Sequence, residues 1–243
     1  MSDASNNQGR AYEFACLNSL YEAISNIRSA RIIINSSYQA AENAWNTLIP
    51  ENRTLYELSA KSTIETIFAL EPNIVEQTSD ILDLYIQNDQ HGEEADVRDI
   101  IIERKDIIWE IGLSIKHNHM AVKHSRIAKN LDFGLKWYNI PCSSTYWNDV
   151  RPIFDFLERE KEKGTYFRDL KSKEDDVYVP LLNAFVKEIS TQIKGDMNVP
   201  RKMIEYLLSK YDFYKVISVD CKRITVIQSF NMYGTLNFPS RAS

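Results

Sequence analysis

The stretch DIIWEIGLSIK, residues 106–116, decides the fold, because its side chains alternate between apolar and polar with the period of a β-strand. One face consists of Ile111, Leu113 and Ile115, and the other carries Glu110, Gly112, Ser114 and Lys116. The preceding run VRDIIIER, residues 97–104, is also rich in β-branched residues, and the short turn RKD joins the two runs. The sequence therefore predicts a β-hairpin with one core face and one polar face.

The register of this hairpin decides which acidic residues meet the polar face. If the turn centres on Lys105, Asp96 lies opposite Ser114, and a pairing shifted by one residue sets Asp99 opposite Glu110. In either register, carboxylates and Lys116 converge on one hairpin.

Outside the hairpin, apolar spacing and proline positions predict a chain that is mainly helical at first and mixed later. Helices are expected at residues 9–27, 36–48, 54–70, 119–129, 146–163, 179–194 and 200–210, and further strands at 80–86, 211–219 and 223–230. The KSKEDD stretch after Leu170 is expected to be a solvated loop. This order predicts an α/β protein.

Composition restricts the class of protein further. The 243 residues are 44% hydrophobic, carry a net charge of −5 and include three widely spaced cysteines, Cys16, Cys142 and Cys221. An odd cysteine count without a CxxC pair argues against a disulfide framework. With no long apolar run and no apolar signal region, the sequence predicts a cytoplasmic protein that does not contact membranes.

The polar face has the residue types that hydrolysis of a phosphodiester requires. Carboxylates such as Asp96 and Asp99 bind Mg²⁺, which activates a water molecule, and Lys116 then orients or stabilises the attacking water. On spacing alone, an alternative stays open in which the aspartates cap a turn and Lys116 is an exposed residue at a strand end.

The residues from Asp96 to His124 resemble the catalytic hairpin of the PD-(D/E)XK nuclease superfamily, and more narrowly the HaeIII family of type II restriction endonucleases. The sequence segments on which this resemblance rests are WEIGLSIKHNH, VKHSR, DFGLKW, PCSSTYW and YDFYKV, together with GRAYEFACL near the start. It implies a mixed central β-sheet flanked by helices and a Mg²⁺-dependent double-strand cut in DNA at a short GC-rich site, GGCC in that family. It also implies a cognate DNA methyltransferase in the same system, and a homodimer is compatible with it.

Residue by residue, the resemblance implies that Asp99, with Asp96 close by, is the first acid and that Lys116 is the motif lysine. Ser114 stands where the superfamily usually has its second acid. Glu110 on the same strand face or Glu13 from the first helix would then supply the missing carboxylate. Glu13 has a second reading, as a helix-start glutamate favoured by the helix dipole.

The DNA contacts are expected just after the hairpin, because no acidic residue occurs between Glu110 and Asp132. The candidates for DNA contact are Ser114, His117, Asn118, His119, Lys123, His124, Arg126 and Lys129, the last residues of which would lie on a phosphate-contacting helix. An ordinary solvated helix face is the alternative. A zinc site at the histidines is rejected, since no fourth ligand of the usual kind is adjacent.

Two further groups of residues are weaker candidates for contact with bases. Trp137, Tyr138, Tyr146 and Trp147, with Pro141, are expected to pack in a core rather than to stack on bases. Arg223, Gln228 and Asn231 carry groups that read base edges in the major groove.

We expect a single nuclease domain over residues 1–243, with a mainly helical part at 1–78, the catalytic hairpin and following helix at 79–130, and a helical then β part at 131–243. Family members are expected to continue beyond FNMYGTLNFPSRAS with another β-containing segment, which would make this chain short by a terminal element. Two other functions stay open: a catalytically inactive or truncated DNA-binding protein with the nuclease fold, for which Ser114 is the argument, and a repair nuclease that recognises DNA structure.

Overall fold

The computed structural model describes residues 3–88, 96–122 and 125–236, and the chain divides into two compact units. The first unit is Met1–Lys123 with Ser209–Ser243, and the second is His124–Leu208, so the second is inserted between two strands of the first. Within the described ranges, no helix is both long and apolar enough to cross a lipid bilayer.

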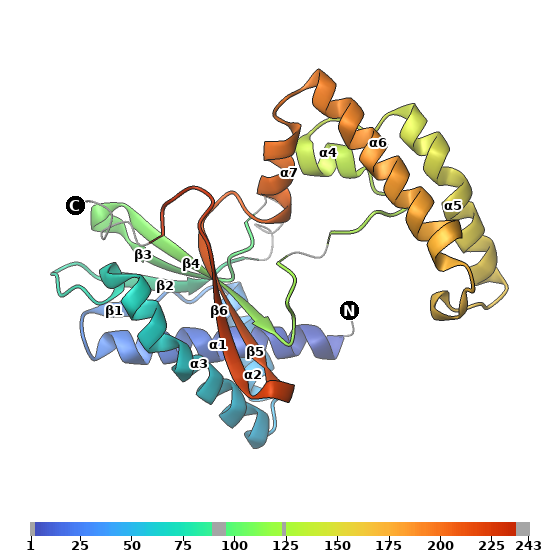
Figure 1. The fold of residues 1–243 in the computed structure, drawn as a ribbon. Coiled ribbons are helices and arrows are strands. Elements are labelled where there is room, and N and C mark those ends of the chain that lie inside the picture. The colour runs from blue at the N-terminus through green and yellow to red at the C-terminus, as the bar shows by residue number, and fades with distance from the viewer. Residues whose placement is uncertain (1–2, 89–95, 123–124, 237–243) are drawn as a thin grey trace. The chain divides into compact units, whose positions relative to one another are not determined.

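The first unit is built on one six-stranded sheet (Figure 1). Its strands are β1 (Ala30–Ile32), β2 (Leu82–Ile86), β3 (Ile100–Arg104), β4 (Trp109–His117), β5 (Phe213–Val219) and β6 (Ile224–Phe230), and they are adjacent in chain order. The pairs β1–β2 and β4–β5 are parallel, whereas the other three pairs are antiparallel. The predicted mixed central sheet is therefore confirmed, and β1 is a strand that the sequence analysis missed.

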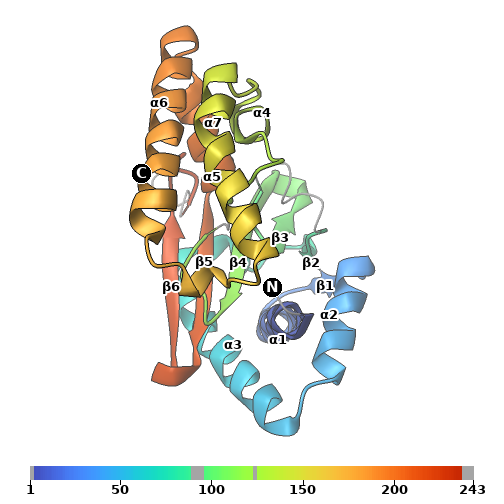
Figure 2. The ribbon, with the colours of Figure 1, turned by 90° about the vertical axis from the view of Figure 1, so that its right-hand side faces the viewer.

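Three helices belong to this unit: α1 (Asp3–Ser25), α2 (Ser36–Asn46) and α3 (Pro50–Leu70). Figure 2 looks along α1 and shows α2 and α3 beside it. The apolar side of α1, including Leu17, Leu20 and Ile24, is buried in one core with Ile111, Leu113 and Ile115 of β4. This burial holds α1 against β4.

The hairpin formed by β3 and β4 has a register that differs from both predictions. Ile100 pairs with Leu113 and Arg104 with Trp109, so Asp99 comes beside Ser114. The turn is longer than RKD, because a 3₁₀ turn at Lys105–Ile107 is followed by Ile108 in the left-handed conformation, with φ of 53°. The extra residues shift the pairing by three or four residues relative to the two predicted registers.

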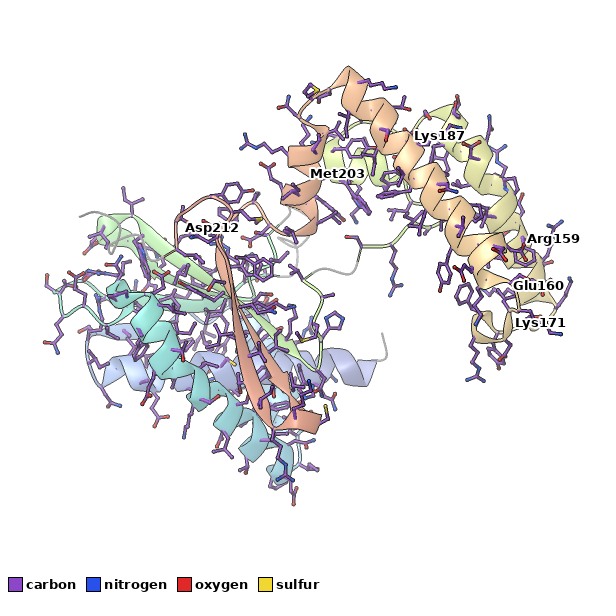
Figure 3. All side chains as sticks on the ribbon, viewed as in Figure 1. Arg159, Glu160, Lys171, Lys187, Met203 and Asp212 are labelled. Atoms are coloured by element: carbon purple, nitrogen blue, oxygen red, sulfur yellow. The ribbon has the colours of Figure 1, made fainter. Side chains whose placement is uncertain are left out.

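The second unit is helical. Its main helices are α4 (Phe133–Tyr138), α5 (Ser144–Glu162), α6 (Val179–Gly195) and α7 (Val199–Leu207). Phe133 lies at the centre of an aromatic core and contacts Trp137, Tyr146 and Phe185. The stretch expected to be a solvated loop instead leads into a π-helical turn at Glu174–Tyr178, directly before α6. Lys187 of α6 and Glu160 of α5 (Figure 3) form surface ion pairs with Asp149 and Lys163, respectively.

Candidate active site

Asp99 and Lys116 form the centre of the candidate site. The Lys116 Nζ donates to Asp99 Oδ2 at 2.8 Å, and each side chain is 23% exposed. The same carboxylate oxygen accepts from the Ile115 backbone N at 2.6 Å and from the Ser114 Oγ at 3.3 Å. Asp99 directly precedes β3 and Lys116 lies near the end of β4, so the antiparallel register itself brings the acid and the lysine together.

Glu13 on α1 belongs to the same electrostatic neighbourhood. Burial opposes the charged form of Lys116, but Asp99 and, through space, Glu13 raise its pKa above the ordinary value. Burial raises the pKa of the Cys16 thiol one helical turn further on, and the charges of Glu13 and Asp99 raise it further. Both carboxylates therefore raise the pKa of Lys116 and that of Cys16. Lys116 is charged at neutral pH.

Glu13 also opens onto free space. It lines a polar cavity of about 340 Å³ together with Arg10, Ser36 and Asn88. A carboxylate at the rim of such a cavity is reachable by an ion or by a phosphate group, whereas a carboxylate sealed in the core is not.

The donor set near Lys116 fits a hard cation. Asp99 and Glu13 offer carboxylate oxygens, and a magnesium ion is usually held by one or two carboxylates with waters and substrate phosphate completing its shell. In the described part of the chain, no group of three or more His, Cys, Asp or Glu side chains is arranged to hold a metal ion.

Asp96 and Glu110 lie in a different cluster, around Arg98. The Arg98 guanidinium donates to Asp96 Oδ2 at 2.8 Å and to Glu110 Oε1 at 2.7 Å, and it stacks on the Tyr211 ring at 3.9 Å. Arg98 and Asp96 are buried, and despite that burial their pairing lowers the pKa of Asp96. Gly112 makes room for this arginine, because a Cβ there would lie 2.0 Å from Arg98 Cδ. Both carboxylates are therefore paired with the same protein cation.

The residues expected to contact DNA from the end of β4 are mostly engaged within the protein. Ser114 is fully buried against Asp99, and His117 Nε2 lies 2.7 Å from Asp220 Oδ2 with its side chain 9% exposed. Asn118 is exposed, but its side chain also bonds Asp220. Ser114 and His117 thus contact other residues of the protein in this structure, and the DNA contacts expected of them stay predictions. His119 is half-buried beside the Ala121 carbonyl.

The helix predicted over residues 119–129 is wrong, because the described residues in that range form no helix. Lys123 and His124 lie outside the described residues. Arg126 is exposed, whereas Lys129 pairs with Asp155 at 3.1 Å and with Glu158 at 2.6 Å. Arg126 and Lys129, which were expected on one helix face, therefore lie in an irregular segment at the start of the second unit.

The aromatic residues and the C-terminal residues considered for contact with bases differ in burial. Trp137, Tyr138 and Tyr146 are buried, which confirms packing as their role. Arg223 is exposed in the turn between β5 and β6, and Gln228 lies on β6. Asn231 is exposed and its side chain accepts from the Leu236 backbone.

Three charged residues of this region escaped the sequence analysis: Arg98, Asp220 and Lys215. Lys215 is 0% exposed on β5, directly beside Ser114 of β4. A signal for it was present, since a lysine in the middle of the apolar strand FYKVISV has no solvated face to occupy. Asp212 just before β5 anchors the chain after β6 by accepting from the backbones of Tyr233 and Thr235 (Figure 3).

A mixed sheet in which an aspartate and a lysine of adjacent strands pair, with a glutamate of the first helix in their electrostatic neighbourhood, is the arrangement expected of a metal-dependent nuclease of the restriction-endonuclease type. The chain matches the model of the HaeIII restriction endonuclease family over residues 9–243. It is 48% identical over 242 residues to the type II restriction enzyme HaeIII of Haemophilus aegyptius, an alignment that covers 99% of this chain and 76% of that protein. No solved structure matches it. The chain belongs to the HaeIII restriction endonuclease family.

Proposed function

We propose that this protein is a type II restriction endonuclease that cuts double-stranded DNA at GGCC and uses Mg²⁺ to do so. The observation that carries the proposal is the 2.8 Å pair between Asp99 and Lys116 on adjacent strands, in a chain of the HaeIII family. A restriction endonuclease of this family acts on DNA with a divalent cation. The target sequence and the choice of Mg²⁺ are the parts that we propose.

In this proposal Asp99 and Glu13 hold the metal ion. When bound, Mg²⁺ would polarise the phosphoryl oxygen and lower the pKa of a water molecule that attacks phosphorus. The Ile115 backbone N–H and the Ser114 hydroxyl orient the Asp99 carboxylate. Lys116, charged and anchored on Asp99, stabilises the negative charge that develops during attack.

Asp96 and Glu110 take a supporting part in this proposal. Because both neutralise Arg98, they hold the residue that packs against Gly112, two residues before Ser114 on β4. They therefore act on the shape of the strand that carries Ser114 and Lys116, whereas Glu13 is the carboxylate that replaces the missing second acid.

The test is a cleavage assay on a plasmid with several GGCC sites, run with Mg²⁺ and with a chelator. Discrete fragments that end at GGCC, and their loss when the sites are methylated beforehand, support a restriction enzyme with a cognate methyltransferase. Binding without cutting would indicate a non-catalytic DNA-binding protein, and smeared or structure-dependent nicks would indicate a repair nuclease. A plasmid without GGCC is the matched control.

Two further proposals concern the state of the protein in the cell. The three cysteines Cys16, Cys142 and Cys221 are free thiols, which suits the reducing cytoplasm. A homodimer would place one site on each strand of a symmetric target, and sedimentation of the protein with a GGCC duplex measures the number of chains bound.

A further inference from the structure

Lys215 is a buried cation for which the nuclease reaction as described above has no use. It lies in the middle of β5 and is 0% exposed. Its Nζ donates to the Met120 backbone carbonyl, and among the described residues no carboxylate lies within ion-pair distance of it. A lysine at such a position usually has an acidic partner.

The environment of Lys215 disfavours its charge. Burial lowers the pKa of Lys215, and the nearby positive charge of Lys116 lowers it further. Replacing a buried charge by a well-packed apolar side chain is often neutral or stabilising. Stability alone therefore gives no reason for a lysine at this position, and a buried cation with a perturbed pKa beside a candidate site is a candidate for a functional role.

The position of Lys215 connects it to the candidate site. Lys215 is in register with Ser114 on the neighbouring parallel strand, and Ser114 in turn donates to Asp99. Paired residues on adjacent strands share a face of the sheet, so Asp99, Ser114 and Lys215 form a row across three strands. Two strand spacings separate the ends of this row, or about 10 Å between Cα positions.

The charges of the four residues Asp99, Glu13, Lys116 and Lys215 sum to zero. Asp99 and Glu13 contribute two negative charges, and Lys116 and Lys215 contribute two positive charges. Asp99 is already shared with Lys116. Without Lys215 the same sum is −1, so Lys215 makes the empty site neutral instead of negative, which weakens both its repulsion of a DNA phosphate and its attraction for a divalent cation.

We propose that Lys215 is a positioning residue of this nuclease site: its buried positive charge makes a DNA phosphate the preferred first ligand, and the divalent cation binds well only once that phosphate is present. The proposal rests on the proposed function, because it assigns Lys215 to the same site. Charge on Lys215 acts through space across the sheet, without contact between its Nζ and the DNA. The order of binding is thereby set by a residue outside the carboxylate and lysine motif.

The competing explanation is purely structural. The bond from Lys215 to the Met120 carbonyl ties the chain that follows β4 to β5, and Asn118 is tied to the same strand through its backbone N–H and the Ser218 carbonyl. An anchoring role requires a hydrogen-bond donor at position 215 but does not require a charge. Two substitutions separate these requirements, since Lys215→Met removes both and Lys215→Gln removes the charge while keeping a donor.

The experiment measures three quantities on the full chain. They are the affinity for a GGCC duplex in chelator, the affinity of the DNA-free protein for Ca²⁺ by calorimetry, and the midpoint of thermal unfolding. For both Lys215→Met and Lys215→Gln we expect DNA affinity to fall about tenfold and Ca²⁺ affinity to rise by up to about tenfold, the size of one charge interaction across a partly desolvated site. Lys215→Met should unfold at the same or a higher temperature.

Lys61→Met is the matched control, because Lys61 is an exposed lysine of α3 and its loss changes the net charge equally. It should change neither affinity by more than about twofold, since exposed charges are screened by solvent and salt. The inference is overturned if Lys215→Gln keeps parental DNA and Ca²⁺ affinities, whatever the stability of Lys215→Met. If the parent protein neither binds nor cuts GGCC DNA, the proposed function is refuted as well. If the parent cuts GGCC DNA and Lys215→Gln keeps the parental affinities, only the role of Lys215 is refuted.

Discussion

The substitution Asp96→Asn distinguishes two roles of Asp96. The residue was predicted to be a metal ligand, whereas in the structure it is the partner of a buried arginine. The Arg98 guanidinium donates to the Asp96 carboxylate at 2.8, 2.9 and 3.1 Å, and both side chains are 6% exposed. Removing one partner of a buried ion pair costs roughly 3–5 kcal/mol. Arg98 keeps its bond to Glu110, and the asparagine keeps one acceptor oxygen, so we expect the loss of stability to be about 2–3 kcal/mol.

For a chain of this length that loss corresponds to a fall of roughly 4–12 °C in the unfolding midpoint. The dependence on pH has a definite sign. The pKa of Asp96 is lowered in the folded protein, so its carboxylate contributes stability above the unfolded value of about 4, and that contribution is lost as the pH falls through the folded value. The difference in unfolding midpoint between the parent and Asp96→Asn should therefore be largest at pH 7 and should become smaller in acid.

The assay is thermal unfolding of both proteins between pH 3 and pH 7, with cleavage measured well below the unfolding midpoint of the variant. Asp149→Asn is the control, because Asp149 pairs with Lys187 on the surface of the second unit, where such a pair contributes about 0–1 kcal/mol. A variant at position 96 that keeps parental stability but loses divalent-cation binding would refute the reasoning and restore Asp96 as a metal ligand.

The remaining predictions concern the reaction and the strand that carries it. Lys116→Ala should abolish cleavage and leave DNA affinity within a few-fold of the parent, and retained cutting would remove the lysine from the reaction. Asp99→Asn should lose Mg²⁺-supported cutting and weaken Ca²⁺ binding in calorimetry, since an amide lacks the charge that a hard cation needs; parental Ca²⁺ affinity would contradict this. Glu13→Gln should slow cleavage at least about a hundredfold under single-turnover conditions, and a smaller effect than that of Glu110→Gln would reverse their assignment. Gly112→Ala should lower stability by about 1–3 kcal/mol in denaturant unfolding, because its Cβ displaces the buried Arg98, and unchanged stability would show that the arginine moves freely.

Much of the fold could be predicted because the strands of this chain carry strong periodic patterns. The runs that became β2, β3, β4, β5 and β6 were all identified from alternation and β-branched residues, and the helices α1, α2, α3, α5, α6 and α7 from apolar spacing. The strand β1 was missed because three residues, Ala30–Ile32, are too short to show a period.

The register and the helix after β4 were predicted wrongly for identifiable reasons. A turn of three residues was assumed, whereas Ile108 adopts a left-handed conformation that β-branched residues rarely take and that no sequence rule favours. Basic residues at helical spacing suggested a helix over 119–129, but a repeat of charged residues without an apolar stripe gives a helix nothing to bury. Both errors arise where tertiary contacts outweigh local preference.

The site itself could be predicted only in part, because the sequence gives the residues but not their partners. Lys116 and Asp99 were predicted to meet on the hairpin, and they do pair. The pairing of Arg98 with Asp96 and Glu110, in contrast, depends on the space left by Gly112. Lys215 lies 101 residues after Ser114, beyond an inserted helical unit, and the parallel pairing of β4 with β5 brings it into the same row.

This long connection has a consequence for how the charges of the site are controlled. The hairpin of β3 and β4 forms from local contacts, so the pair between Asp99 and Lys116 depends on few residues distant in the chain. The buried charge of Lys215 reaches the site only after β5 has docked beside β4, with the second unit intervening in the chain. The charge balance of the proposed site therefore depends on the pairing of β5 with β4, whereas its acid and lysine are brought together by one hairpin.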